Sequence, residues 1–177
     1  SSVLLKHMTL DSMQGDCRVK DYFESLGVRS VETEHGVELH QTEATVSHFE
    51  ADLKGEPDLA QAIAFTCAAL GISCRLRGLH TLRLKETDRI GAMQECLRRL
   101  SLEVEAGEDY LAFSGKVKRE SHHRFGTYQD HRMAMSLSIL LPALGEMKLE
   151  DEEVVKKSFP HYWESLRTLG VCDFTRT

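Results

Sequence analysis

Apolar and polar residues along the chain follow an order of elements that occurs twice. In the first occurrence, a helical pattern over 16–27 is followed by two short strand-like stretches within 28–40, separated by a polar turn. In the second, a helical pattern over 87–100 is followed by two strand-like stretches within 102–113. This matching order predicts that the chain repeats one supersecondary unit.

A second pair of helices supports the repeat. Helices that begin near Asp58 and Asp130 each end at a glycine and lead into a short strand, and these two aspartates are 72 residues apart. Asp16 and Asp88, at the starts of the first pair of helices, are separated by the same 72 residues. The common period predicts the unit β-α-β-α-β-β, repeated twice, with a partial third copy over 159–170.

The helices predicted over 59–70 and 133–141 are apolar almost all round. A helix of this kind is buried on every side, whereas a helix that lies on a sheet at the surface keeps one polar face. In the predicted strands, polar residues occur at alternating positions instead. Arg83 and Lys85 are an example, because their side chains would project to the same face of an extended segment. We therefore expect a mixed α/β fold with buried helices inside and sheets outside.

Composition and charge restrict the class of protein. The chain has 177 residues, of which 41% are hydrophobic and 28% charged, as is typical of globular proteins. A net charge of −6 argues against nucleic acid as a partner, because binding to a phosphate backbone needs a basic face. The sequence contains no membrane-spanning stretch and its start has no features of a signal peptide. We expect a cytoplasmic protein with no membrane partner, whose first strand begins as if inside a longer chain.

Cysteine and histidine positions argue against two kinds of site. The five cysteines include no C-x-x-C pair, and the nine histidines show no ligand spacing with a second His or Cys. An odd number of cysteines without such pairs indicates a reducing compartment rather than a disulfide scaffold or a zinc site. We therefore expect no bound metal.

The segment Lys85–Arg89 has the highest density of charge. Thr87 would cap the helix that follows, and Glu86 and Asp88 suit a helix start, because carboxylates are favoured at the positive end of the helix dipole. A capped helix therefore explains these three residues. It does not explain Arg89, a cation in the first helical turn, where the dipole disfavours positive charge.

The segment Asp130-His131-Arg132 raises the same question. A capping Asp130 is ordinary, but His131 and Arg132 place two potential cations at the positive end of an otherwise apolar helix. Each such charge costs a few tenths of a kcal/mol up to about 1 kcal/mol unless something offsets it. A bound anion would do so, because free backbone N–H groups and cations then act together. The segment therefore favours a site for a small anionic metabolite.

Asp58 and Lys157 have comparable positions in the repeat. Asp58 follows Pro57 at the start of a buried helix, where capping and substrate binding explain it equally well. Lys157 lies just before the third-copy helix, and considered alone it is a surface lysine. Because Asp58 and Asp130 are equivalent in the repeat, several helix N-termini are expected to converge on one surface.

Three charged segments, at 84–89, 128–135 and 157–160, resemble motifs of the 5-enolpyruvylshikimate-3-phosphate (EPSP) synthase family in order and approximate spacing. The similarity extends over essentially the whole chain and corresponds to the C-terminal portion of a full enzyme. It implies a single domain over 1–177, built as an inside-out α/β barrel from about two units and part of a third. The second, substrate-binding domain of the family has no counterpart in this chain.

The resemblance implies a transferase of the shikimate pathway, which supplies aromatic amino acids. The family moves the enolpyruvyl group of phosphoenolpyruvate onto the 5-hydroxyl of shikimate 3-phosphate, through a tetrahedral intermediate whose breakdown releases phosphate. It needs no metal or organic cofactor. The implied partners are these two substrates and the missing N-terminal half of the same enzyme, and a chain with half of the site would be inactive alone.

The resemblance also implies individual roles. Asp58 and Glu86 are the candidate groups for proton transfer, and His131, beside the cations that bind phosphoenolpyruvate, is a third catalytic residue. Which of the two carboxylates acts in which step stays open. Lys85 would hold the shikimate moiety. The carboxylate and phosphate of phosphoenolpyruvate would be neutralised by Arg89, Arg132 and Lys157.

Three alternative interpretations of the sequence stay open. UDP-N-acetylglucosamine enolpyruvyl transferase shares the fold but is not expected to carry both charged motifs together. RNA 3′-phosphate cyclase is built from similar units, and the acidic balance of this chain disfavours it. A non-catalytic module that docks a partner half is the third alternative.

Overall fold

The structure, a computed structural model, describes residues 2–12, 14–118 and 123–171. In chain order, the strands are β1 (Ser2–Lys6), β2 (Val28–Thr33), β3 (Gly36–Gln41), β4 (His48–Asp52), β5 (Ser73–Arg77), β6 (Glu103–Ala106), β7 (Leu111–Ser114), β8 (His123–Gly126) and β9 (Met147–Glu150). The α-helices are α1 (Val19–Ser25), α2 (Ala60–Leu70), α3 (Arg89–Arg99), α4 (His131–Leu137), α5 (Leu141–Leu144) and α6 (Tyr162–Thr168). Short 3-10 helices are η1 (Gly15–Arg18), η2 (Pro57–Leu59), η3 (His80–Leu84), η4 (Ser138–Leu140) and η5 (Glu152–Lys157).

The described strands form three separate sheets. In the four-stranded sheet, β4 and β5 are parallel, β7 pairs antiparallel with β5, and β6 lies beyond β7. The sheet of β1, β3 and β2 repeats the antiparallel part of this arrangement, and β8 and β9 repeat its parallel part. The order β-α-β-α-β-β is therefore complete once, from β4 to β7, with partial copies before and after it.

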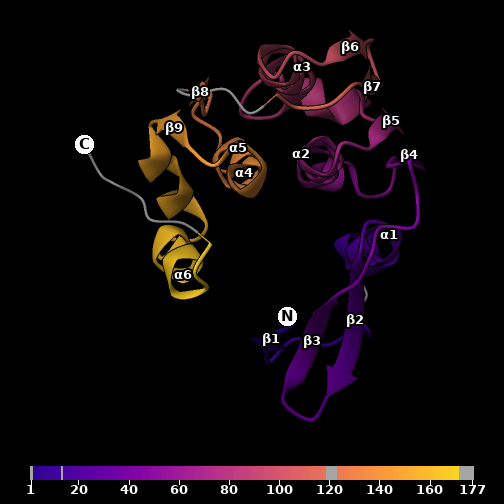
Figure 1. The fold of residues 1–177 in the computed structure, drawn as a ribbon, viewed down its shortest axis with the longest axis vertical. Helices are drawn as coiled ribbons and strands as arrows, with labels where there is room; N and C mark the ends of the chain where they lie inside the picture. The colour runs from indigo at the N-terminus through magenta and orange to yellow at the C-terminus, as the bar shows by residue number, and fades with distance from the viewer. Residues whose placement is uncertain (1, 13, 119–122, 172–177) are drawn as a thin grey trace.

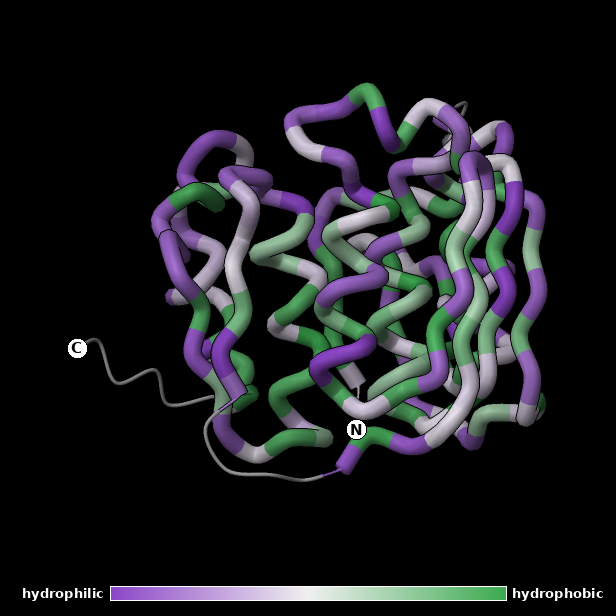
Figure 2. Tube along the Cα trace, turned by 90° about the horizontal axis from the view of Figure 1, so that it is seen from above, coloured by the Kyte–Doolittle hydropathy of each residue, from purple (hydrophilic) through white to green (hydrophobic). Residues whose placement is uncertain are grey.

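The sheets lie along an arc with α2 and α4 side by side within it (Figure 1). Seven of the eleven residues of α2 are buried, whereas the strands alternate, with buried positions at every second residue of β4. The same alternation is visible along the strands in Figure 2. A mixed α/β fold is confirmed, and α2 is largely buried, but α1 has no buried residue and the described strands form open sheets that do not close into a barrel.

The helix expected from Asp130 to Leu144 is not continuous. A 3-10 turn, η4, separates α4 from α5. Pro142 accounts for the break, because it has no N–H to donate to the carbonyl of Ser138 and its ring collides with that carbonyl in a regular helix. By contrast, α2 is uninterrupted and ends at Gly71, whose φ of 69° is the left-handed conformation that glycine adopts readily.

None of the helices in the described parts of the chain combines the length and the apolar composition that crossing a bilayer requires.

Candidate functional site

Charged residues from three helix starts and two connecting segments meet in one cluster. Asp58 lies in η2, just before α2, and Arg89 is the first residue of α3. Asp130 is the N-cap of α4. Because α2, α3 and α4 pack against one another, these three helix N-termini are brought together. Lys85 and Glu86 join them from the segment between η3 and α3, and Lys157 from the end of η5.

Arg89 is the centre of this cluster. It is buried, with 1% of its surface exposed, and every nitrogen of its guanidinium donates to a carboxylate. Nε donates to Oδ2 of Asp130 at 2.7 Å, and Nη2 to Oδ1 of the same residue at 3.3 Å. Nη1 donates to Oδ1 of Asp58 at 2.8 Å, and Nη2 also reaches Oε2 of Glu86 at 3.0 Å. Three carboxylates of the chain itself therefore offset the cost of this cation at a helix start.

Asp130 contributes more than a helix cap. Its carboxylate is 0% exposed, and Oδ1 accepts hydrogen bonds from the backbone N–H groups of Arg132 at 2.8 Å and Met133 at 3.4 Å. The same carboxylate pairs with Arg89, which is 41 residues away in sequence. The sequence alone predicted only a capping role for Asp130. Its equivalence to Asp58 in the repeat was the one signal of a larger role, because no local pattern reveals a pairing over that separation.

Besides Arg89, Asp58 pairs with the two partly exposed cations Lys85 and Arg132. Lys85 Nζ lies 3.3 Å from its Oδ1, and Arg132 Nη2 lies 3.3 Å from its Oδ2. The N-cap of η2 is Glu56, so Asp58 is not the capping residue of this helix. Of the two explanations that the sequence left open for Asp58, the geometry favours a role in the charged site.

The segment before α3 differs from its sequence prediction in two respects. Arg83 lies in the 3-10 helix η3 and not in a strand, and its side chain bonds Asp88 at 2.6 Å and the carbonyl of Gly107 at 2.5 Å. Lys85 faces Asp58 instead, so the two cations do not share a face. The helix cap is Asp88, which accepts from the N–H of Gly91, rather than Thr87. Arg83 thereby fixes the start of α3 and the segment that carries Lys85 and Glu86.

Glu86 pairs with Lys157, whose Nζ lies 3.2 Å from Oε1. A hydrogen bond from its own backbone N–H and a second one from Lys157 lower the pKa of Glu86 from 4.5 to about 2. Nearby Arg89 contributes to this lowering, and partial burial opposes it. At neutral pH the group is therefore a carboxylate that can accept a proton but holds none to give.

Replacing Lys157 by methionine is expected to raise the pKa of Glu86 toward its ordinary value of 4.5, because the second-largest cause of the shift is removed. Stability supplied by a depressed carboxyl pKa is present above the unfolded value and is lost as the pH falls through the folded value. In the unmodified chain, the stability that the Glu86 carboxyl supplies is lost between about pH 4.5 and 2. This pH range should become narrower in the variant. A carbon-detected NMR titration of the Glu86 carboxyl measures the midpoint. An unchanged midpoint would show that Lys157 does not act on Glu86 in solution.

His131 opens α4 beside the cluster but takes no part in its ion pairs. Its Nδ1 is buried and has no hydrogen-bond partner among the described residues. Burial lowers the pKa of His131, with a raising effect from Asp130 and a lowering one from Arg132. The imidazole is therefore mainly neutral at pH 7.

The cluster as a whole joins four cations to three carboxylates, which leaves one net positive charge. Lys157 is the most exposed of the cations, Arg132 and Lys85 are partly exposed, and Arg89 is enclosed. An anion can approach the outer three directly, but it has to compete with Asp58 and Glu86 for them. No group of His, Cys, Asp and Glu suited to a metal ion occurs within residues 2–12, 14–118 and 123–171.

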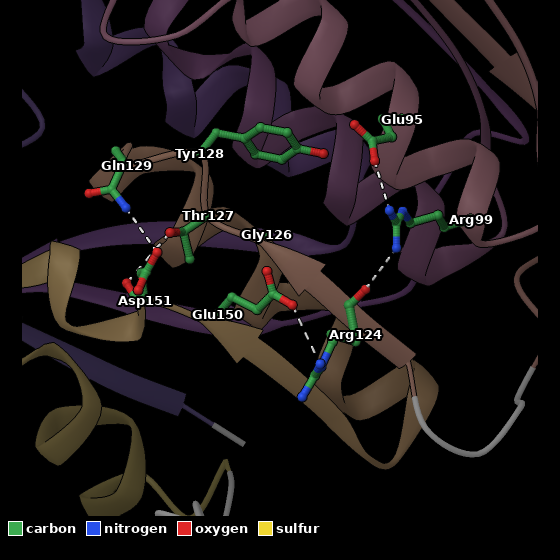
Figure 3. Close-up of a pocket in the computed structure, with 9 residues that line it drawn as sticks. All are labelled: Glu95, Arg99, Arg124, Gly126, Thr127, Tyr128, Gln129, Glu150 and Asp151. Carbon is green, nitrogen blue, oxygen red and sulfur yellow. Dashed lines mark hydrogen bonds and ion pairs between the residues drawn. The ribbon is translucent and has the colours of Figure 1, made fainter.

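A pocket of about 350 Å³ is lined in part by the segment that leads from β8 to Asp130 (Figure 3). It is lined by Glu95, Arg99, Arg124, Gly126, Thr127, Tyr128, Gln129, Glu150 and Asp151, and contains none of the predicted site residues. Its two arginines already have carboxylate partners, Arg99 with Glu95 at 2.8 Å and Arg124 with Glu150 at 3.6 Å. With a third carboxylate in its lining, this pocket suits a multiply charged anion less well than the Arg89 cluster.

Comparison with known proteins agrees with the charged motifs. The family model described as EPSP synthase (3-phosphoshikimate 1-carboxyvinyltransferase) matches residues 1–166. A 3-phosphoshikimate 1-carboxyvinyltransferase of Bacteroides fragilis is 35% identical over 161 residues, which are 90% of this chain and 39% of the relative. One from Salmonella arizonae is 35% identical over 164 residues, which are 90% of this chain and 36% of the relative.

The fold has a counterpart among solved structures. EPSP synthase from Acinetobacter baumannii aligns with a TM-score of 0.69 and 20% identity, over 94% of this chain and 41% of the other. At this identity the likeness concerns the fold alone. The chain thus spans well under half the length of the relatives that it matches.

Proposed function

Because the chain belongs to the EPSP synthase family, we propose that it forms one part of an enzyme that transfers the enolpyruvyl group of phosphoenolpyruvate to the 5-hydroxyl of shikimate 3-phosphate. The single observation that carries the proposal is the cluster around Arg89, in which cations from separate segments surround two partly exposed carboxylates. Phosphoenolpyruvate and shikimate 3-phosphate are both multiply charged anions, so fixed cations are needed where they meet.

The reaction requires proton transfer at carbon and at oxygen. In the addition step, the 5-hydroxyl oxygen bonds to C2 of phosphoenolpyruvate, the hydroxyl proton leaves, and C3 gains a proton. In the elimination step, C3 loses a proton, the C2–C3 double bond forms again, and the C2–O bond to phosphate breaks. Two carboxylates close to the substrates suit these transfers, and Asp58 and Glu86 are the candidates, with the step that each serves left open.

Glu86 also has the means to change its protonation on binding. Lys157 helps to lower its pKa to about 2. An incoming phosphate or carboxylate attracts Lys157 away and adds negative charge nearby, and both effects raise a carboxyl pKa. Glu86 would then hold a proton within reach of the reacting carbon.

The remaining residues have positioning or electrostatic roles in this proposal. Lys85 holds the shikimate moiety, while Arg132 and Lys157 neutralise phosphoenolpyruvate beside the neutral His131. Arg89 adds its charge to the same anion, but its nitrogens are engaged by carboxylates, so direct contact requires Glu86 to move from Nη2. The buried Arg89 thereby links substrate binding to a change at Glu86.

The proposal extends to the rest of the protein. The chain acts as one domain over 1–177, in the cytoplasm, and its open sheets are completed into an inside-out α/β barrel by further units. The other wall of the substrate site comes from an N-terminal half of the same enzyme. The chain alone should therefore release phosphate from the two substrates at a negligible rate. Turnover of the isolated chain at the rate of the assembled enzyme would contradict the half-site proposal.

Binding of phosphoenolpyruvate to the chain tests the site directly. Lys157→Met is expected to weaken binding by about tenfold or more, because a charge-assisted hydrogen bond to the anion is lost. Isothermal titration calorimetry or chemical-shift titration measures the dissociation constant. The neighbouring Lys156→Met is the matched control, since Lys156 is equally exposed and pairs with Glu153 instead. Equal losses in the two variants would indicate non-specific attraction and would remove support for this site.

A further inference from the structure

The chain enters α4 through a tight turn over 127–130. The backbone N–H of Asp130 donates to the carbonyl of Thr127 at 3.0 Å, and the two residues between them, Tyr128 and Gln129, both have a φ of 56°. Turns of this conformation ordinarily have glycine or asparagine at the central positions, because other side chains collide with the backbone at positive φ. A bulky tyrosine is poorly suited to it, so contacts outside the 127–130 turn must hold it in place.

Contacts on two sides hold the 127–130 turn (Figure 3). On one side, Gln129 Nε2 donates to Oδ2 of Asp151 at 2.8 Å, and Thr127 Oγ1 donates to the carbonyl of Asp151 at 3.5 Å. On the other side, Tyr128 packs against the main hydrophobic core, and its Oη lies 3.8 Å from Sγ of Cys96 in α3. Asp151 has a φ of 55°, so three of the five non-glycine residues with positive φ in the described parts of the chain lie here. Backbone strain of this kind persists chiefly where a function needs the conformation.

Helix α3 contacts the 127–130 turn at two points. Arg89, the first residue of α3, pairs with Asp130, and Cys96, seven residues later, lies against Tyr128. Residues seven apart lie on the same face of a helix, so one face of α3 holds the turn. The Asp130 carboxylate caps α4 and also binds two nitrogens of Arg89, and it can do both only from one backbone position. The turn fixes that position.

We propose that the 127–130 turn is a positioning element for the reaction, and that Tyr128 is its positioning residue. The inference rests on the proposed function, because the turn acts through Glu86. Asp130 and Glu86 share Nη2 of Arg89, at 3.3 Å and 3.0 Å. If the turn relaxed, the Asp130 carboxylate would withdraw and Arg89 would hold Glu86 more firmly. A carboxylate held in this way takes up a proton less readily, so proton transfer would slow.

The effect should fall on turnover more than on substrate binding. Lys85 and Lys157 come from segments outside the turn and outside α4, and their carboxylate partners are Asp58 and Glu86. The cations that meet the substrates first therefore stay in place when the turn changes. A misplacement of about 1 Å at a reacting group can lower the rate by about a hundredfold. A fall in kcat with little change in KM is the expected pattern.

Two substitutions of Gln129 test the conformation of the turn. Gln129 is exposed, so replacing it acts mainly through the backbone. Glycine adopts positive φ readily, whereas valine, which is branched at Cβ, adopts it least readily. In the enzyme reassembled from this chain and the rest of the protein, Gln129→Val should lower kcat by about tenfold to a hundredfold, and Gln129→Gly by less than about threefold. If the valine variant does not fold, Gln129→Ala, with less strain, should still differ from glycine in the same direction.

Ser101→Val is the matched control for strain. Ser101 is exposed, has a φ of 62° and lies just after the far end of α3. Valine there introduces similar strain away from Asp130, so it should lower stability and leave kcat unchanged. The Nε–H proton of Arg89, observed by NMR in the chain itself, reports the hydrogen bond to Asp130. Its signal should move upfield in Gln129→Val and stay in place in Gln129→Gly and Ser101→Val.

The side chain of Tyr128 is tested separately. Tyr128→Phe keeps the ring that packs on the core and loses only the hydroxyl, so it should keep most of kcat. Tyr128→Ser loses the ring and should lower kcat as much as Gln129→Val does. Thermal denaturation of both variants shows how much of each loss comes from stability.

The other outcomes decide against the proposal. Equal kcat values for Gln129→Gly and Gln129→Val, or equal losses of kcat in Gln129→Val and Ser101→Val, would overturn it. An Arg89 signal that moves while kcat stays unchanged would also overturn it, because the reaction would not depend on the position of Asp130. If the unmodified reassembled enzyme releases no phosphate, the proposed function fails, and the Arg89 signal still decides whether the turn positions Asp130.

Discussion

Replacing Arg89 by methionine is expected to lower the free energy of unfolding of the chain by about 3–5 kcal/mol. Methionine keeps the unbranched apolar stem of the side chain and removes the charged guanidinium, so the main loss is electrostatic, with a smaller contribution from the space that is left. It leaves Asp130 as a buried carboxylate without its bidentate cation, and leaves Asp58 and Glu86 repelling it. Urea denaturation followed by circular dichroism measures the change.

Two further variants make the Arg89 result specific. Arg99→Met removes an exposed i,i+4 pair with Glu95 and should cost no more than about 0.5 kcal/mol. Adding Asp130→Asn to Arg89→Met should recover part of the loss, because the unpaired charge is removed while the helix cap is kept. If Arg89→Met does not fold, Arg89→Lys can replace it, because lysine keeps the charge but lacks the bidentate geometry. Arg89→Lys should also lower the free energy of unfolding, by a smaller amount. A loss under about 1 kcal/mol for Arg89→Met would mean that the cluster is not closed in solution.

Replacing Asp58 by asparagine is expected to change binding and turnover in opposite directions. Asp58 pairs with Lys85 and Arg132, so its carboxylate competes with an incoming anion for both cations. Without that charge, phosphoenolpyruvate should bind the chain about tenfold more tightly. Turnover by the chain reassembled with the rest of the enzyme should fall by about a hundredfold to ten-thousandfold, the contribution of a general base.

The opposite signs separate a catalytic carboxylate from a structural one. Titration calorimetry gives the affinity, and phosphate release gives the turnover. Glu50→Gln is the control, because Glu50 pairs with Arg77 at 2.6 Å on the exposed face of the four-stranded sheet and should affect neither quantity. Weaker binding together with slower turnover would point to general loss of structure. Tighter binding with unchanged turnover would exclude Asp58 as the base and leave that role to Glu86.

The fold could be predicted where periodicity and turn residues agreed. The hairpin of β2 and β3, and that of β6 and β7, begin and end close to their predicted positions because polar turns separate apolar alternations. The strands at 48–52 and 123–126 had no predicted range. Only Phe125 is buried in the second of these, and both strands owe their conformation to parallel pairing with a segment more than twenty residues later.

The sequence could predict which residues belong to the site but not which of them pair with one another. The awkward position of a cation at the start of α3 showed that Arg89 needed a negative partner, and the sequence analysis assigned that role to substrate. The structure shows that Asp130, Asp58 and Glu86 of the chain itself are also its partners. A dipole argument gives the sign of the missing charge and nothing about its source. Identifying Asp130 required knowing that α3 and α4 pack together, which is a property of the tertiary fold.

Because three carboxylates share Arg89, they also limit which substitutions the sequence can accept at these positions. Substituting any one of these acids alters the charge balance felt by the other two, so the effect of one change depends on which residues are present at the rest. In a relative, a neutral residue at one of these positions therefore favours a compensating change at another. Variation at 58, 86, 89 and 130 should therefore be inherited as sets, and new substrate preferences in such a lineage should begin at Lys85 or Lys157, which lie outside this mutual dependence on Arg89.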